Sequence, residues 1–168
     1  IRCSTMKKMT SWKDTVYVEH NFLDKKLCKE YIEKAQRPSE KIRKSWTMEN
    51  QCWEERTINI MGDPIALKVK KIICEHLNRD LELTRAQIQT WMVGTAATLH
   101  IHNVDPSTWN TVLYLNDDFD GGFFYTKNGL VIKPEPGLLT LFNGRKVFHG
   151  VGEVKKNYRF SLIFWWKQ

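Results

Sequence analysis

The chain has 168 residues, of which 42% are hydrophobic and 12% aromatic, and a formal net charge of +7. This length and apolar content suit a single domain with a substantial core. No apolar run approaches the roughly 20 residues of a membrane span, and the first residues lack the apolar centre of a signal peptide, so we expect a soluble, intracellular (cytoplasmic) protein with no membrane partner.

The positive charge is spread through the first half of the chain, as on an ordinary solvated surface. Nucleic acid is therefore a minor alternative partner that the net charge does not exclude. The four cysteines are far apart and form no Cys-x-x-Cys pair. Cys28 and Cys74 fall on the apolar faces of predicted helices, where free thiols are common, so we expect no disulfide framework.

The chain begins with a segment that has no clear pattern, and we expect residues 1–11 to be a flexible leader. Alternating side chains over residues 14–19 predict a first strand. Apolar residues at helical spacing then predict a helix over residues 25–36, with Asp24 as its N-cap and Pro38 marking its end.

Residues 39–56 show no clean period, and we expect a long loop. Its two tryptophans, Trp46 and Trp53, either anchor the loop on the core or contact a ligand. A second helix follows, because Pro64 suits the first helical position and apolar residues repeat at helical spacing over residues 65–77.

From residue 87 the pattern changes to short alternating strands separated by turn signals. Over residues 87–93 the alternation places Gln87, Gln89 and Trp91 on one face. Further strands are expected over residues 110–116, 123–125, 131–133, 138–142 and 158–166, with hairpin signals at Asn128-Gly129 and Asn143-Gly144. Short strands after a helical first half predict an α+β, mainly β chain that ends in a jelly-roll barrel.

Three histidines in this second half form a candidate metal site, although each could also be an ordinary packed and hydrogen-bonded histidine. His100 and His102 are two residues apart, and side chains at positions i and i+2 of a strand point the same way. His149 follows a later apolar run, and Arg159 comes ten residues after it. We interpret residues 151–157 as a hairpin, which would make the strands of His149 and Arg159 neighbours.

These residues together resemble the Fe(II)/2-oxoglutarate-dependent oxygenases of the prolyl 4-hydroxylase type. The resemblance covers about half the chain and rests on Trp91-x-x-Gly94-x5-His100-x-His102, Asn110-Thr-Val-Leu-Tyr-Leu-Asn-Asp117 leading to Gly121-Gly122, Pro136-Gly137-x4-Phe142, and His149-Gly-Val-x-x-Val154-x4-Arg159. It implies one domain over residues 1–168, in which a double-stranded β-helix over residues 87–168 carries the metal site. Residues 1–86 would supply supporting helices and a lid region.

The resemblance implies that Fe(II) is held by three histidines, His100, His102 and His149, and that 2-oxoglutarate is the co-substrate. Arg159 and Tyr114 would bind its far carboxylate, and Trp91 would wall its pocket; Thr111 and Asn116 are weaker candidates. Ascorbate is a further candidate cofactor. The implied reaction is hydroxylation of an unactivated C–H of a prolyl or other side chain, in a peptide, protein or amino-acid substrate.

The sequence departs from the family pattern at one position, because His102 stands where the family has aspartate. Three imidazoles can hold Fe(II) on one face, but they remove no positive charge from it, whereas a carboxylate removes one unit. Asp105 is a rival third ligand, or else it caps the turn before Pro106. Two further alternatives stay open: a catalytically impaired barrel that acts as a binding module, and a tri-His dioxygenase that does not use 2-oxoglutarate.

Overall fold

The computed structural model describes residues 6–37, 41–46, 52–103 and 107–168, and for residues 41–46 and 52–55 it describes the backbone. The elements follow in chain order as β1 (Lys7–Ser11), β2 (Asp14–Glu19), α1 (Lys25–Ala35), β3 (Lys41–Trp46), β4 (Cys52–Asn59), α2 (Ile65–Leu77), β5 (Glu82–Trp91), β6 (Ala97–His100), β7 (Trp109–Tyr114), β8 (Asp120–Gly121), β9 (Phe124–Thr126), β10 (Val131–Ile132), β11 (Leu139–Asn143), β12 (His149–Val151), β13 (Val154–Lys156) and β14 (Arg159–Lys167).

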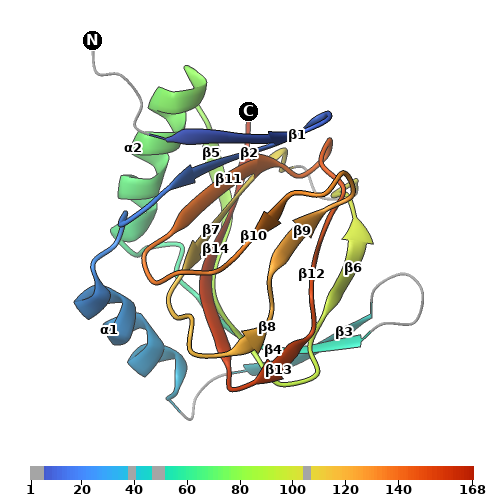
Figure 1. Cartoon of the computed structure of the whole chain (residues 1–168). Helices are drawn as coiled ribbons and strands as arrows, with labels where there is room; N and C mark the ends of the chain where they lie inside the picture. The colour runs from blue at the N-terminus through green and yellow to red at the C-terminus, as the bar shows by residue number, and fades with distance from the viewer. Residues whose placement is uncertain (1–5, 38–40, 47–51, 104–106) are drawn as a thin grey trace.

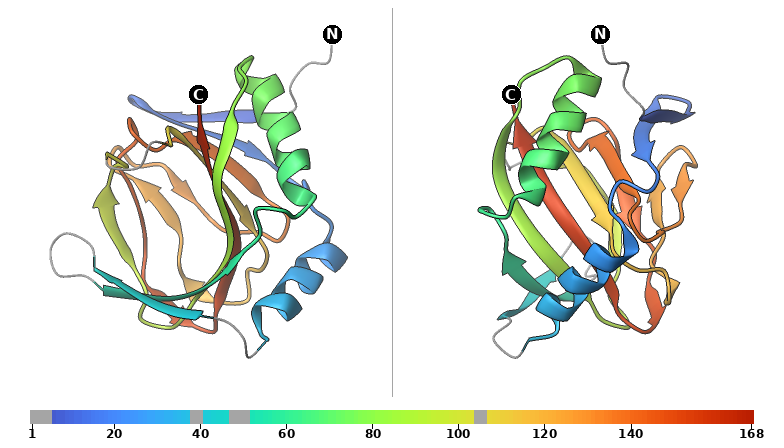
Figure 2. Two further views of the ribbon diagram at one scale, coloured as in Figure 1. Left: turned by 180° about the vertical axis from the view of Figure 1, so that it is seen from behind. Right: turned by 90° about the vertical axis from the view of Figure 1, so that its left-hand side faces the viewer.

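Two antiparallel sheets make up most of the fold. The larger has eight strands in the order β1-β2-β11-β7-β14-β5-β4-β3, and the smaller has four in the order β10-β9-β12-β6. The smaller sheet lies opposite the larger one (Figure 1), and both helices cover the outer face of the larger sheet (Figure 2). The mainly β jelly roll predicted from the sequence is therefore confirmed.

Strand β14 is a nearly continuous apolar run in the sequence. Both faces of the sheet are covered at this strand, so odd-numbered and even-numbered residues alike are buried. One parity packs in the core under the helices, through Phe160, Leu162, Phe164 and Trp166. The other parity faces the space between the two sheets and comprises Arg159, Ser161, Ile163 and Trp165. The polar members of this second set, Arg159 and Ser161, are thereby held inside the barrel.

The two helices begin as their sequences predict. Asp24 caps α1 by accepting a hydrogen bond from the backbone N–H of Leu27 at 2.8 Å. The Asp63 carboxylate accepts from the backbone N–H of Ile65 at 2.9 Å and from the hydroxyl of Tyr31 at 2.8 Å, so it joins the start of α2 to α1. No helix within the described residues is long and apolar enough to span a membrane.

Two parts of the first half differ from the expectation. Residues 7–11 are not a leader but the edge strand β1, which pairs along its length with β2. The expected loop over residues 39–56 contains β3 and most of β4, an antiparallel pair that extends the larger sheet beyond β5. The side chains of Trp46 and Trp53 lie outside the described residues.

Candidate functional site

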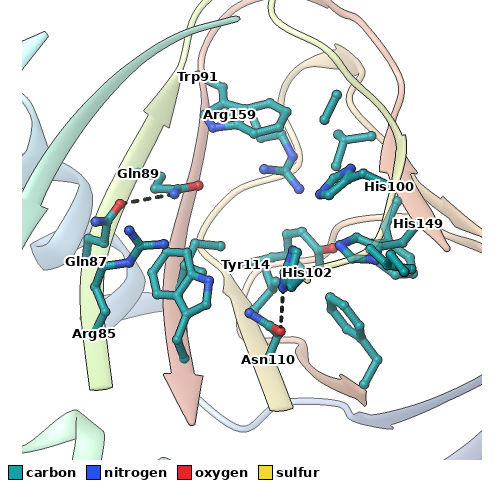
Figure 3. Close-up of a pocket in the computed structure, with 18 of the residues that line it drawn as sticks. Arg85, Gln87, Gln89, Trp91, His100, His102, Asn110, Tyr114, His149 and Arg159 are labelled. Carbon is teal, nitrogen blue, oxygen red and sulfur yellow. Dashed lines mark hydrogen bonds between the residues drawn. The ribbon is translucent and has the colours of Figure 1, made fainter. Parts of the chain in front are cut away.

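A cavity of about 520 Å³ opens between the two sheets. Its walls come from the barrel-facing side chains of β5, β7 and β14 on one side and of β6, β9 and β12 on the other. Six of the site residues that the sequence singled out line this cavity: Trp91, His100, His102, Tyr114, His149 and Arg159. Figure 3 shows their side chains around the same open space.

The three histidines reach the cavity from two neighbouring strands and a loop. His100 ends β6 and is paired with His149, the first residue of β12. His102 lies two residues beyond the end of β6, so the expectation that His100 and His102 share a strand holds only for His100. The rings nevertheless converge, with centroids 4.4 to 5.3 Å apart and one nitrogen of each within 4.8 Å of the others.

Each histidine ring is held by a hydrogen bond at Nδ1. The backbone carbonyl of Thr98 lies 2.6 Å from Nδ1 of His100, and that of Val147 lies 2.8 Å from Nδ1 of His149. A carbonyl oxygen only accepts, so these Nδ1 atoms carry the proton and the Nε2 lone pairs remain available to a metal.

His102 has a side-chain partner instead, because its Nδ1 lies 2.9 Å from Oδ1 of Asn110.

Burial and the neighbouring rings of His100 and His102 lower the pKa of His149 to about 3. At neutral pH His149 is therefore in the uncharged form that binds metals.

This donor set fits a divalent transition metal. Three imidazoles that meet at one point can occupy one face of the metal and leave the other positions to exogenous ligands. Among the described residues that line the cavity there is no aspartate or glutamate, so these imidazoles are the metal-binding groups it offers. Asp105, the rival ligand, lies outside the described residues.

Arg159 lies on the opposite wall from the histidines and is only 3% exposed. Its Nε donates a hydrogen bond to the carbonyl oxygen of Gly122 at 3.1 Å. Its guanidinium carbon lies 4.8 Å from the ring centroid of Trp91 and 5.2 Å from that of Tyr114. Within the described residues no carboxylate forms an ion pair with it. Burial lowers the pKa of this guanidinium, and Tyr114 opposes that effect.

Tyr114 is completely buried beside Arg159. Burial raises the pKa of its hydroxyl, and the charge of Arg159 opposes this. Although the guanidinium is close, the hydroxyl makes no hydrogen bond of ordinary geometry with any described residue. Arg159 and Tyr114 thus bring a cation and a hydroxyl to the same end of the cavity.

Two weaker candidates from the sequence do not line the cavity. Thr111 faces away from it and accepts a hydrogen bond from the indole N–H of Trp166 at 3.0 Å. Asn116 holds the chain near the start of β14, because its Oδ1 accepts from the backbone N–H of Phe160 at 2.9 Å. We therefore assign neither residue to the site.

The expected pairing between the strands of His149 and Arg159 is wrong. Strand β12 pairs with β6 and β9, whereas β14 pairs with β5 and β7 in the other sheet. The segment between them includes β13, which pairs with β8. The histidines and Arg159 therefore meet across the cavity from facing sheets rather than side by side.

Further polar residues line the cavity without having been assigned a role from the sequence. Gln87 and Gln89 are buried on β5, where Nε2 of Gln89 donates to Oε1 of Gln87 at 3.1 Å. The guanidinium carbon of Arg85 lies 3.8 Å from the ring centroid of Trp165. The alternation along β5 places these residues on one face of the strand, but the sequence alone could not show which face lines the barrel interior.

No protein-family model matches the sequence, and no curated protein sequence matches it. Solved structures do match in fold. A 2OG-Fe(II) oxygenase family protein from Burkholderia pseudomallei is 15% identical with a TM-score of 0.74, over 90% of this chain and 84% of that one. A prolyl hydroxylase from Trichoplax adhaerens, solved with a peptide fragment of the hypoxia inducible factor oxygen degradation domain, is 19% identical with a TM-score of 0.70, over 90% and 83%.

A third match has a different activity. SnoN, the non-heme alpha-ketoglutarate-dependent epimerase of nogalamycin biosynthesis, is 11% identical with a TM-score of 0.74, over 93% of this chain and 77% of that one. At such low identities the likeness establishes the fold that these oxygenases share. It does not establish the reaction, because one fold hosts many chemistries.

Proposed function

We propose that this chain, which has the fold of the 2OG-Fe(II) oxygenases, is an Fe(II)- and 2-oxoglutarate-dependent dioxygenase that hydroxylates an unactivated C–H. The proposed substrate is a prolyl residue or another side chain of a peptide, protein or amino acid. Support comes from the fold, from the three converging histidines and from the charge of the cavity around them.

The observation that carries the proposal is the burial of Arg159 without a carboxylate partner among the described residues. A guanidinium that is 3% exposed and has no carboxylate partner among the described residues is costly to bury. It faces the cavity that also contains the three histidines. A small dicarboxylate would relieve this cost by placing one carboxylate against Arg159 while its other end lies at the metal. The planar N–H edge of arginine suits bidentate contact with that carboxylate.

The protein groups have distinct parts in the proposed reaction. His100, His102 and His149 would hold Fe(II), which supplies the redox chemistry that activates oxygen when 2-oxoglutarate is bound. Arg159 would orient the co-substrate by its far carboxylate, and the Tyr114 hydroxyl beside Arg159 would donate a second hydrogen bond to that carboxylate.

The histidine at position 102 changes the electrostatics rather than the geometry of this site. Neutral imidazoles leave the full charge of a metal dication uncompensated, and Arg159 adds a further positive charge. A dianionic co-substrate is therefore attracted more strongly than it would be at a site with one carboxylate ligand. The same imidazoles donate less electron density to the metal, which favours a slower oxidation.

The reactivity is tested by incubating the iron-loaded protein with 2-oxoglutarate under oxygen and measuring succinate. We expect succinate to form, and to form faster when a proline-containing peptide that serves as substrate is added. Ascorbate should prolong the reaction if it keeps the metal reduced. Bound 2-oxoglutarate without succinate would identify a binding module. Oxygen consumption without any need for 2-oxoglutarate would identify a different tri-His dioxygenase.

A further inference from the structure

His102 is the ligand that departs from the family pattern, and it differs from the other two histidines in its support. His100 and His149 are each held by a backbone carbonyl two residues earlier in the chain. His102 lies beyond the end of β6 and is held instead by the side chain of Asn110, eight residues later on β7. The orientation of this one ring therefore depends on a side chain that can be changed by mutation.

Asn110 is well placed to fix that ring. It is 2% exposed, on an interior strand between β11 and β14, so its own position is set by the sheet. The carboxamide oxygen lies 2.9 Å from Nδ1 of His102, and Figure 3 shows this hydrogen bond as a dashed line between the two side chains. With the proton on Nδ1, the free lone pair lies on Nε2, which is the nitrogen that His102 then offers to a metal.

Gly144 provides the space in which these two side chains meet. A Cβ at position 144 would lie 2.3 Å from Oδ1 of Asn110 and 2.6 Å from Nδ1 of His102. The φ angle of Gly144 is not in the left-handed region, so the backbone does not require glycine. The backbone N–H of His102 also donates to the carbonyl oxygen of Gly144 at 2.8 Å. A side chain at position 144 would therefore overlap the His102–Asn110 contact.

We propose that Asn110 is the positioning residue of the third metal ligand: it holds Nδ1–H of His102 so that Nε2 binds the metal, in a space that only glycine at position 144 leaves open. The inference rests on the metal site of the proposed function, but it concerns metal binding alone. Losing such a partner typically weakens metal binding about ten- to a hundredfold. An aspartate in place of Asn110 would accept the same hydrogen bond more strongly and would supply negative charge to the ring.

The test uses Co(II) as the probe metal and two readouts that need no turnover, the Co(II) dissociation constant and the proton spectrum of the Co(II) protein. The parent should show three solvent-exchangeable, strongly shifted imidazole N–H signals, one from each histidine. Asn110→Leu should weaken Co(II) binding about tenfold or more and lose one signal to fast exchange. Asn110→Asp should keep all three signals and bind Co(II) at least as tightly as the parent.

Two further variants separate this role from a general effect on folding. Gly144→Ala should reproduce the loss seen in Asn110→Leu although Asn110 is intact. Gln87→Leu removes another buried carboxamide from the cavity wall, far from the histidines, and should leave Co(II) affinity unchanged. The proposal is overturned if Asn110→Leu is folded, binds Co(II) within about twofold of the parent and retains three signals. A parent that binds Co(II) but not 2-oxoglutarate would instead refute the proposed function and leave this inference standing.

Discussion

Arg159 and Trp91 are directly opposite each other on the paired strands β14 and β5, and the guanidinium carbon of Arg159 lies 4.8 Å from the Trp91 ring centroid. The indole and the phenol ring of Tyr114 flank the guanidinium, and its Nε is bound to Gly122. The cation is thereby fixed in orientation before any ligand arrives, which lowers the entropy lost on binding.

The first prediction is that Arg159→Met separates co-substrate binding from stability. Anaerobic calorimetric titration of 2-oxoglutarate into the Mn(II)-loaded variant should show affinity reduced about thirtyfold or more, because the far carboxylate loses its charged partner. Without 2-oxoglutarate the variant should be as stable as the parent, or more stable by about 1 kcal/mol, since an unpaired buried charge is removed.

Arg159→Lys is the matched control for this change. It keeps the charge but loses the planar pair of donors, so its affinity for 2-oxoglutarate should lie between those of the parent and Arg159→Met. Equal affinity in all three proteins would show that Arg159 does not bind the co-substrate.

The second prediction concerns the charge at position 102. His102→Asp should raise succinate formation from 2-oxoglutarate severalfold, because a carboxylate ligand lowers the charge of the metal and donates more electron density. The asparagine of His102→Asn has nearly the same shape as the aspartate of His102→Asp but no charge, so this variant should not show the gain in succinate formation. If the two variants have the same rate, position 102 is not a metal ligand and Asp105 becomes the better candidate.

The third prediction tests the turn that supports Arg159. Gly121 has a φ of 71°, and a Cβ there would lie within 1.9 Å of the carbonyl oxygen of Glu153. Gly121→Ala should destabilise the protein by more than the roughly 1–2 kcal/mol that the left-handed backbone alone costs. Gly62→Ala is the control, since no atom lies within 4 Å of a Cβ at that position. Urea unfolding of both variants measures the difference, and equal midpoints would contradict the close approach.

The fourth prediction concerns the link between the helices. Burial and the hydrogen bond to Asp63 raise the pKa of the Tyr31 hydroxyl. A raised folded-state pKa means that the stabilisation is complete below the ordinary tyrosine pKa of about 10 and is lost as the pH rises above it. Tyr31→Phe should therefore be less stable than the parent near neutral pH, with a gap that narrows above about pH 10. If the urea midpoints of the parent and Tyr31→Phe differ by the same amount near neutral pH and above about pH 10, this coupling is refuted.

Much of the architecture could be predicted because local patterns and tertiary packing agree there. Asp24 caps α1 as ordinary helix chemistry requires, and the alternation over β5 placed Gln87, Gln89 and Trp91 on one face, which is the cavity face. The spacing of the histidines and Arg159 likewise indicated residues that the fold does bring to one cavity.

The parts that could not be predicted depend on contacts between distant segments. Residues 7–11 and 41–46 are rich in lysine and polar side chains, and they become strands by pairing with β2 and β4 at the edges of the sheet. Charged edge strands protect a sheet from aggregation, but they carry little periodicity. The turn signals over residues 151–157 indicate a hairpin between two apolar strands, whereas the chain crosses from one sheet to the other there.

In the proposed site three imidazoles bind one metal opposite an arginine that captures a dicarboxylate. A crystal structure with Mn(II) and N-oxalylglycine, an inert analogue of 2-oxoglutarate, tests it most directly. We expect the metal to be bound by Nε2 of His100, His102 and His149, and the far carboxylate of the analogue to contact Arg159. A metal bound elsewhere, or an analogue that leaves Arg159 without a carboxylate, would rule out this site.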